Sequence, residues 1–280
     1  MAVADPLIAW RKEFPIVETC TYLVSHSLGA MPRRTASYLQ QFADEWSSRG
    51  VRAWHEGWWE TGRTTGDLLA PVLGVRPGTI SMHQNVTVAM SIIASCHTFD
   101  GTRNRIVMTD LEFPSNMYLF EGFRRYGADI VYVKSPDAVR SDLEALLDAI
   151  DERTVLVPLS YVLFKSACIQ DAAAVIEKAH RVGARVILDV YQAAGTVPLE
   201  IEALGADFAV GGSVKFKWSP TGMPCRSAIP AARSESAMKT MALTDVIRPW
   251  EKQRSAASVS AAVRPQSSAL TINTRLHASK

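Results

Sequence analysis

The sequence predicts an α/β fold in which helices cover both faces of a mostly parallel sheet. Between residues 86 and 210, short runs of β-branched and apolar residues alternate with helical segments of about a dozen residues, a pattern typical of parallel sheets. The run Arg185-Val-Ile-Leu188 is almost entirely apolar, as expected for a strand buried on both faces. A chain of 280 residues is long enough for one such domain and a smaller piece.

The expected elements begin with a helix over 33–48, in a lead-in rich in tryptophan. Short β-branched runs predict the strands, and the segments of about a dozen residues between them predict the helices. Helices are expected at 86–96, 115–126, 143–150 and 171–182, and strands at 105–109, 130–133, 155–159, 185–188 and 206–210. We therefore divide the chain into an N-terminal segment (1–50), a main domain (51–215) and a tail (216–280).

Composition excludes several classes of protein. The formal charge of +2 predicts neither nucleic-acid binding nor attraction to membranes. No apolar run reaches the ~18 residues of a membrane span, and the N-terminus lacks a signal-peptide core, so we expect a cytoplasmic protein. The four cysteines form no CxxC pair and the six histidines form no HExxH motif, so no metal site is expected.

The tail differs from the rest of the chain. Residues 1–215 carry 20 basic and 25 acidic side chains, whereas residues 216–280 carry 10 and 3. The tail is rich in Ser, Ala, Arg and Pro and shows no sustained helix or strand period. It resembles translation in a shifted reading frame, although a divergent or truncated gene would look similar. We expect most of it to be disordered, because its low apolar content does not offset the entropy of ordering.

The chemistry is expected at the carboxyl ends of the strands, where open α/β sheets bind ligands. There is no GxGxxG motif, P-loop or GxSxG motif. Asp189 directly follows the strand 185–188, and Lys215 follows the next strand after Gly211-Gly-Ser213. Successive strand ends bring Asp189 and Lys215 to the same side of the sheet. On spacing alone, an ordinary ion pair remains an alternative to a functional pair.

Two further segments belong to this edge of the sheet. Asn85 is a plausible N-cap for the helix that contains Val86 and Thr87, and a helix N-terminus suits a phosphate group. Simple capping is the alternative. Phe113 lies between a strand and a helix, where an aromatic residue most often belongs to the core.

Four segments together resemble the aminotransferase class V family, and within it the kynureninase branch of fold type I pyridoxal-phosphate enzymes. Tyr22-Leu-Val-Ser-His-Ser-Leu-Gly29 resembles a Tyr-Leu-x-x-Asn-Ser-Leu-Gly segment, and Glu112-Phe-Pro-Ser-Asn116 resembles Phe-Pro-Ser/Thr-Asp. Asp189-Val-Tyr-Gln-Ala193 resembles Asp-x-x-His-Ala, and Ser213-Val-Lys215 resembles Ser-x-Lys. The resemblance covers roughly residues 10–215. It implies a sheet domain followed by a small C-terminal domain, which the tail does not resemble.

The resemblance implies a role for each matching residue. Lys215 would hold pyridoxal 5′-phosphate covalently and move protons, and Asp189 would keep the pyridine nitrogen protonated. Phe113 would stack on the ring, and Gln192 would lie near the ring hydroxyl. Val86, Thr87 and Ser213 would hold the phosphate, and His26 and Ser27 would contact the substrate.

Three positions depart from the family pattern. Gln192 replaces a histidine, which preserves a hydrogen bond but not an acid–base role. Val214 replaces the tyrosine that precedes the lysine, and removes a phosphate contact or proton donor. His26 stands where asparagine is usual, and a polar loop residue without a substrate contact is the alternative reading. These departures leave the cofactor prediction intact and bear on the substrate.

The leading functional hypothesis is kynureninase-like hydrolysis of a carbon–carbon bond in an amino-acid side chain. Another class V reaction, such as transamination, epimerisation or cysteine desulfuration, is the alternative, and Phe113 and Val214 argue against desulfuration. A catalytically inactive remnant is a hypothesis of a different class. The family forms homodimers, but the unusual tail argues against the usual subunit contacts in this chain.

Overall fold

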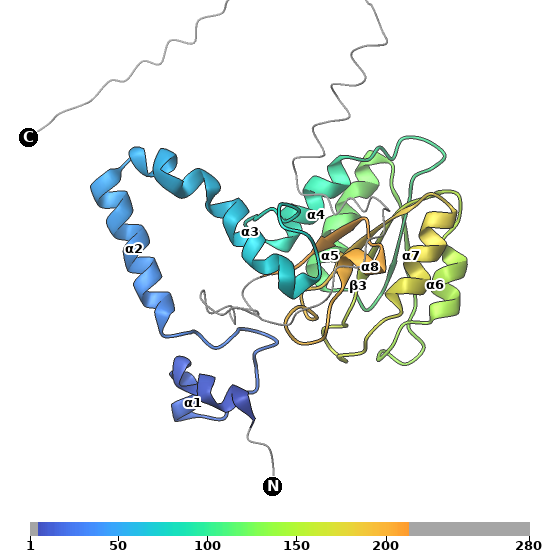
Figure 1. Cartoon of the computed structure of the whole chain (residues 1–280). Helices are drawn as coiled ribbons and strands as arrows, with labels where there is room; N and C mark the ends of the chain where they lie inside the picture. Colours follow the sequence, from blue (N-terminus) through green and yellow to red (C-terminus); the bar gives the residue numbers. More distant parts are fainter. Residues whose placement is uncertain (1–4, 213–280) are drawn as a thin grey trace, which may run out of the picture. The chain divides into compact units, whose positions relative to one another are not determined.

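The structure is a computed structural model that describes residues 5–212. Its centre is a five-stranded parallel sheet in the order β2-β1-β3-β4-β5. Figure 1 shows helices on both sides of this sheet. The strands are β1 Arg105–Thr109, β2 Asp129–Val133, β3 Thr154–Ser160, β4 Arg185–Asp189 and β5 Phe208–Val210. The α-helices are α1 Ile16–Thr19, α2 Arg34–Arg49, α3 Trp59–Leu73, α4 Val86–Ser95, α5 Pro114–Glu121, α6 Leu143–Ala149, α7 Ala172–Arg181 and α8 Ile201–Leu204. Shorter helical turns are η1 Pro6–Glu13, η2 Trp54–Trp58 and η3 Gly122–Tyr126.

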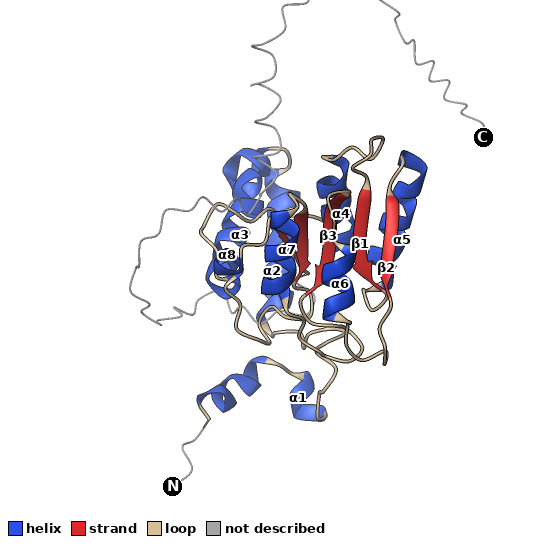
Figure 2. Cartoon of the chain, turned by 90° about the vertical axis from the view of Figure 1, so that its right-hand side faces the viewer, coloured by secondary structure: helices blue, strands red, loops and turns tan. Residues whose placement is uncertain are grey.

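Helices cover both faces of this sheet, with α6 and α7 on one side and α4 and α5 on the other (Figure 2). Alternating strand residues point to opposite faces, because the side-chain period of a strand is two. Val107, Val157 and Leu188 therefore pack with α6 and α7. Ile106, Leu156 and Ile187 pack with α4 and α5 on the opposite face. These two clusters of buried side chains, one on each face, fix the register of the strands.

The register brings the carboxyl ends of three strands together. Ser160, the last residue of β3, pairs with Asp189, the last residue of β4. Asp189 in turn pairs with Val210 at the end of β5. The ladder continues past the strands, because the Tyr161 amide donates to the Asp189 carbonyl oxygen over 2.8 Å. Side chains that follow these strands consequently share one edge of the sheet.

The predicted fold class is confirmed: the structure is α/β with a parallel sheet covered on both faces. The predicted strands agree closely with β1 to β4, and the predicted 33–48 helix with α2. The 115–126 helix is wrong beyond Glu121, where the chain tightens into the 3₁₀ turn η3. The strand expected from residue 206 begins only at Phe208, because Gly205 adopts a left-handed conformation (φ 84°) directly before Ala206.

Helix α3 was not predicted, because Pro71 and Gly66 interrupt its helical pattern. Gly66 packs against Ile80, where a Cβ atom would lie 2.7 Å from the Ile80 carbonyl oxygen. Proline and glycine ordinarily disfavour a helix interior, so tertiary packing decides this element. Within residues 5–212, no helix has the length and apolar character needed to cross a membrane. The predicted disordered tail lies outside the described residues.

Candidate functional site

A pocket with a volume of about 500 Å³ lies at the carboxyl edge of the sheet. This volume is in the range of small-molecule sites. Strand ends, two helix N-termini and an N-terminal loop contribute its walls. It is lined by His26, Ser27, Asn85, Val86, Thr87, Phe113, Ser115, Asn116, Ser160, Val162, Phe164, Asp189, Tyr191 and Gln192.

Asp189 is the buried carboxylate of this pocket, with only 6% of its surface exposed. Asn116 donates its side-chain amide to Oδ2 over 2.8 Å. The Tyr191 backbone amide donates to Oδ1 over 2.8 Å. Hydrogen bonds to both oxygens favour the ionised form of a carboxyl group and fix its orientation. The carboxylate belongs to the lining of the pocket, where it can face the cationic part of a ligand.

The N-terminus of α4 forms a second wall. Asn85 caps this ten-residue helix by accepting from the Val88 amide over 2.9 Å. The amides of Val86 and Thr87 belong to the first turn, where the helix itself provides no acceptor. The helix dipole adds positive potential at the same place. This wall therefore suits an anionic group such as a phosphate.

Aromatic side chains form a third wall. Phe113 has 43% of its surface exposed, and its ring lies edge-on to the Phe164 ring at a centroid distance of 5.0 Å. Phe113 is thus not a core residue, which the sequence left open. Its exposed face is available to a planar ring.

A loop from the N-terminal segment supplies His26 and Ser27. The loop is closed by a hydrogen bond from the Tyr22 hydroxyl to the Leu28 carbonyl oxygen over 2.6 Å. A second bond runs from the Ser27 amide to the Val24 carbonyl oxygen over 2.8 Å. Both residues lie far from the sheet residues in sequence, and the fold brings them to the same pocket.

The structure thus gathers seven of the site residues expected from the sequence. These residues are His26, Ser27, Val86, Thr87, Phe113, Asp189 and Gln192. Ser213, Val214 and Lys215 lie outside the described residues. Asn116 and Glu112 were missed as site residues, although both stand in a segment that the sequence singled out.

Glu112 is a buried acid beneath the pocket, with 2% of its surface exposed. Its carboxyl group accepts hydrogen bonds from the Ser160 amide and hydroxyl and from the Thr109 hydroxyl. It therefore ties the end of β1 to the end of β3. Burial, with a smaller contribution from the Asp189 charge, raises the pKa of Glu112 to about 7 despite the lowering effect of the Ser160 and Thr109 hydrogen bonds. Its position in the segment that leads from β1 to α5, at the carboxyl edge of the sheet, could have found this residue.

We expect Glu112→Gln to change how stability depends on pH. The folded-state pKa of about 7 lies above the ordinary 4.5, so the folded chain binds more protons than the unfolded chain between these values. Its free energy of unfolding therefore falls by roughly 3 kcal/mol as pH rises through this window. The neutral glutamine can accept from Ser160 and donate to Thr109, so the variant should lose this fall. Urea denaturation across the window measures it.

The matched control is Glu152→Gln at an exposed position. This substitution removes the same charge from the surface and should leave the pH dependence of unfolding unchanged, within about 0.5 kcal/mol. A Glu112→Gln variant with the same pH dependence as the parent chain would show that Glu112 does not titrate in this window.

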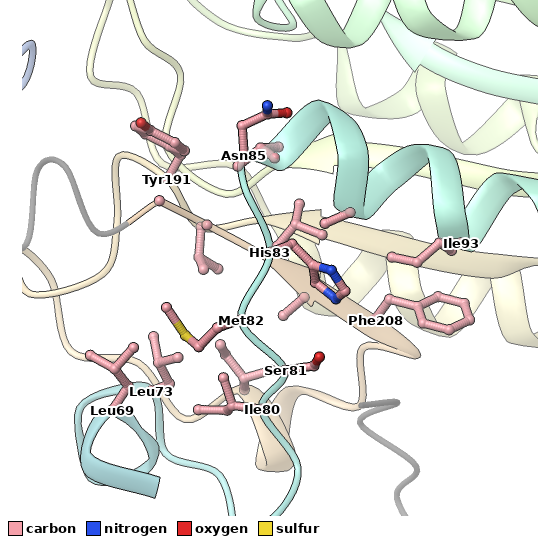
Figure 3. Close-up of a pocket in the computed structure, with 18 of the residues that line it drawn as sticks. Leu69, Leu73, Ile80, Ser81, Met82, His83, Asn85, Ile93, Tyr191 and Phe208 are labelled. Atoms are coloured by element: carbon pink, nitrogen blue, oxygen red, sulfur yellow. The ribbon is translucent and has the colours of Figure 1, made fainter. Parts of the chain in front are cut away.

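A second, apolar cavity of about 220 Å³ adjoins the site. The extended segment from Ile80 to Asn85 runs past β5, with Leu69 and Leu73 of α3 at the far end (Figure 3). Asn85, Val86 and Tyr191 line both cavities. Gly212 packs so closely that a Cβ atom would lie 2.0 Å from the Tyr191 ring. The backbone at Gly212 therefore lies directly against Tyr191, a residue of the polar pocket.

Comparison with known proteins agrees with this geometry. The sequence profile named Aminotransferase class-V matches residues 21–225. A kynureninase of Pseudomonas fluorescens is 30% identical over 222 residues, which cover 76% of this chain and 52% of that relative. A kynureninase of Bacillus cereus is 30% identical over 221 residues, with the same coverage. The chain spans about half the length of the curated relatives it matches.

Solved structures share the fold. A mutant of the protein C-DES, with glycine covalently linked to its pyridoxal-phosphate cofactor, superimposes with a TM-score of 0.65 at 21% identity, over 75% of this chain and 57% of that one. The apo cysteine desulfurase from Thermococcus onnurineus gives a TM-score of 0.65 at 19% identity, over 79% of this chain and 56% of that one. At these identities the likeness concerns the fold alone.

Proposed function

The chain belongs to the aminotransferase class V family, and from this premise we propose that Lys215 binds its cofactor covalently and that the chain acts on an amino acid by kynureninase-like hydrolysis. The fold is that of fold type I pyridoxal-phosphate enzymes, and the cofactor of the family is pyridoxal 5′-phosphate. The observation that carries the proposal is a single pocket that joins a buried carboxylate, a helix N-terminus and an exposed aromatic ring.

The described residues fit this cofactor. Asp189 offers an oriented carboxylate to the ring nitrogen, and the first-turn amides of Val86 and Thr87 offer donors to the phosphate. Phe113 offers its exposed ring face, and Gln192 offers a side-chain amide to the ring hydroxyl. Each of these groups matches a different part of the same small molecule. Together they fit the cofactor better than they fit a simple anion.

Chain connectivity keeps Lys215 within reach of this pocket. Lys215 lies three residues beyond Gly212, so their Cα atoms are separated by at most about 11 Å. Gly212 itself contacts Tyr191, which lines the pocket. A neutral lysine amine adds to an aldehyde and can afterwards carry a proton.

When bound, the cofactor supplies an electron sink for a carbanion on the amino acid. The residues of this chain then have defined tasks. Asp189 holds a proton on the ring nitrogen, and Lys215 moves the proton at the substrate α-carbon. His26 and Ser27 line the pocket, where they can contact a substrate side chain.

Other class V reactions remain the second candidate. Transamination and epimerisation use the same cofactor site and differ in substrate contacts. Desulfuration needs a reactive cysteine; the described cysteines Cys20, Cys96 and Cys168 do not line the pocket, and Cys225 lies outside the described residues. Kynureninase-like hydrolysis is preferred because relatives of this name match most of the chain, including the Phe113 and Asp189 segments.

We expect the full chain to gain visible absorption after incubation with pyridoxal 5′-phosphate and dialysis, and to convert kynurenine. Mass spectrometry of the products separates the reactions. Hydrolysis adds water and yields two fragments, whereas transamination keeps the carbon skeleton and replaces the amine by a ketone. Absorption without any conversion would support the inactive remnant. Absence of both would reject the proposed function.

A further inference from the structure

Asn116 has an unusual place in the fold. It lies in the first turn of α5 and has only 1% of its surface exposed. Its side-chain amide donates to Asp189 Oδ2 over 2.8 Å, although the two residues are 73 positions apart in sequence. Its backbone amide donates to the Phe113 carbonyl oxygen over 2.9 Å, which fixes the turn that carries it. The contact therefore joins two of the pocket walls.

The chemistry of this contact is directional. An ionised carboxylate only accepts hydrogen bonds, so Asn116 must present its NH₂ group to Asp189. An amide donor stabilises the charged form of the carboxylate and cannot take its proton. An aspartate at this position, as in the resembling Phe-Pro-Ser/Thr-Asp element, would instead repel Asp189 or share a proton with it.

We propose that Asn116 is a positioning residue that keeps the Asp189 carboxylate charged and aimed into the pocket, so that the site selects a ring with a protonated nitrogen. The inference deepens the proposed function and rests on it. It concerns residues of this chain, because the Asn116 side-chain amide donates to Asp189 Oδ2 and the Tyr191 backbone amide donates to Asp189 Oδ1.

The surroundings support this role. Glu112, the other buried acid near Asp189, accepts its hydrogen bonds from Ser160 and Thr109. Among the described side chains that line the pocket, His26 and Tyr191 are the other groups able to titrate. The Asn116 side chain donates directly to Asp189 Oδ2 and so helps to orient the carboxylate.

The test compares two aldehydes that differ at one ring atom. Equilibrium dialysis measures the affinity of the full chain for pyridoxal 5′-phosphate and for its deaza analogue, in which carbon replaces the ring nitrogen. We expect a preference of about 10-fold to 100-fold for pyridoxal 5′-phosphate, the effect of one hydrogen bond between charged groups. Asn116→Ala should lose most of this preference, by about 10-fold.

Asn85→Asp is the matched control. It retains the cap on α4 and adds a negative charge to the same pocket, so it should weaken both aldehydes by a similar factor and leave their ratio unchanged. A merely structural role for Asn116 would likewise lower both affinities equally. An unchanged ratio in Asn116→Ala would therefore overturn the proposal.

A second measurement does not need the cofactor. Asn116→Asp preserves the shape of the side chain but places another carboxylate against Asp189, so its stability should fall below that of the parent chain as pH rises from about 4 to about 8. The comparison is made between two proteins that differ at this one side chain, so the difference in stability reports the added carboxylate. Equal stability of Asn116→Asp and the parent chain at the upper pH would refute the proposal that Asn116 positions Asp189. If the parent chain binds neither aldehyde, the proposed function fails and this measurement alone decides the role of Asn116.

Discussion

Replacing Lys215 by alanine is expected to abolish the covalent attachment of pyridoxal 5′-phosphate. The chain then loses its visible absorption, and any turnover of kynurenine falls by on the order of 10³-fold or more, because one amine provides both the covalent link and the proton transfer. Cofactor affinity should fall less steeply, because the Asp189, Val86 and Thr87 contacts remain. Absorption spectra after dialysis and product assays measure the two effects separately.

Lys165→Ala is the control for this experiment. Lys165 Nζ lies 5.6 Å from the centre of the Phe164 ring, and Phe164 lines the pocket, so Lys165 is a described lysine close to the site. Removing it should leave the visible absorption intact. Loss of absorption in Lys165→Ala, with retention in Lys215→Ala, would show that Lys165 forms the covalent link and would contradict the role proposed for Lys215.

Asp189→Asn is expected to impair chemistry far more than cofactor binding. A neutral amide no longer holds a proton on the ring nitrogen, so turnover should fall by about 10² to 10³-fold, a typical effect of losing one preorganised electrostatic contact. Affinity for pyridoxal 5′-phosphate should fall by only about 10-fold, because the phosphate and ring contacts are independent of Asp189. Steady-state kinetics and equilibrium dialysis on the same preparations provide both values.

Asp110→Asn provides a matched control for that substitution. Asp110 follows β1, another strand of the same sheet, but its carboxylate accepts from the Ser135 amide and lies 3.5 Å from Lys134, outside the pocket. Its replacement should leave the ratio of turnover to cofactor affinity unchanged. Full turnover in Asp189→Asn would contradict the ring-nitrogen role of Asp189.

The sheet could be predicted from sequence because its strands carry a local signal. The apolar run 185–188 needs burial on both faces, and the structure places β4 between β3 and β5. Helix α3 carries no such signal, because Pro71 lies within it. Its formation depends on packing, as at Gly66 against Ile80, which no local pattern reveals.

The candidate site also combines features that the sequence predicts locally with features that depend on packing. Asp189 and Phe113 follow strands, and the topology of a parallel sheet was enough to bring them to one edge. The hydrogen bond between Asn116 and Asp189 spans 73 positions, so it depends on the seating of α5 against the sheet. The raised pKa of Glu112 depends on complete burial, which follows only from the packed structure.

The most direct test of the account is to find which lysine the cofactor modifies. The full, unsubstituted chain is incubated with pyridoxal 5′-phosphate, reduced with borohydride, digested and mapped by mass spectrometry. The account predicts that the label lies on Lys215, three residues beyond the glycine that contacts Tyr191. A label on Lys165 or Lys217 in place of Lys215, or no label at all, would contradict it.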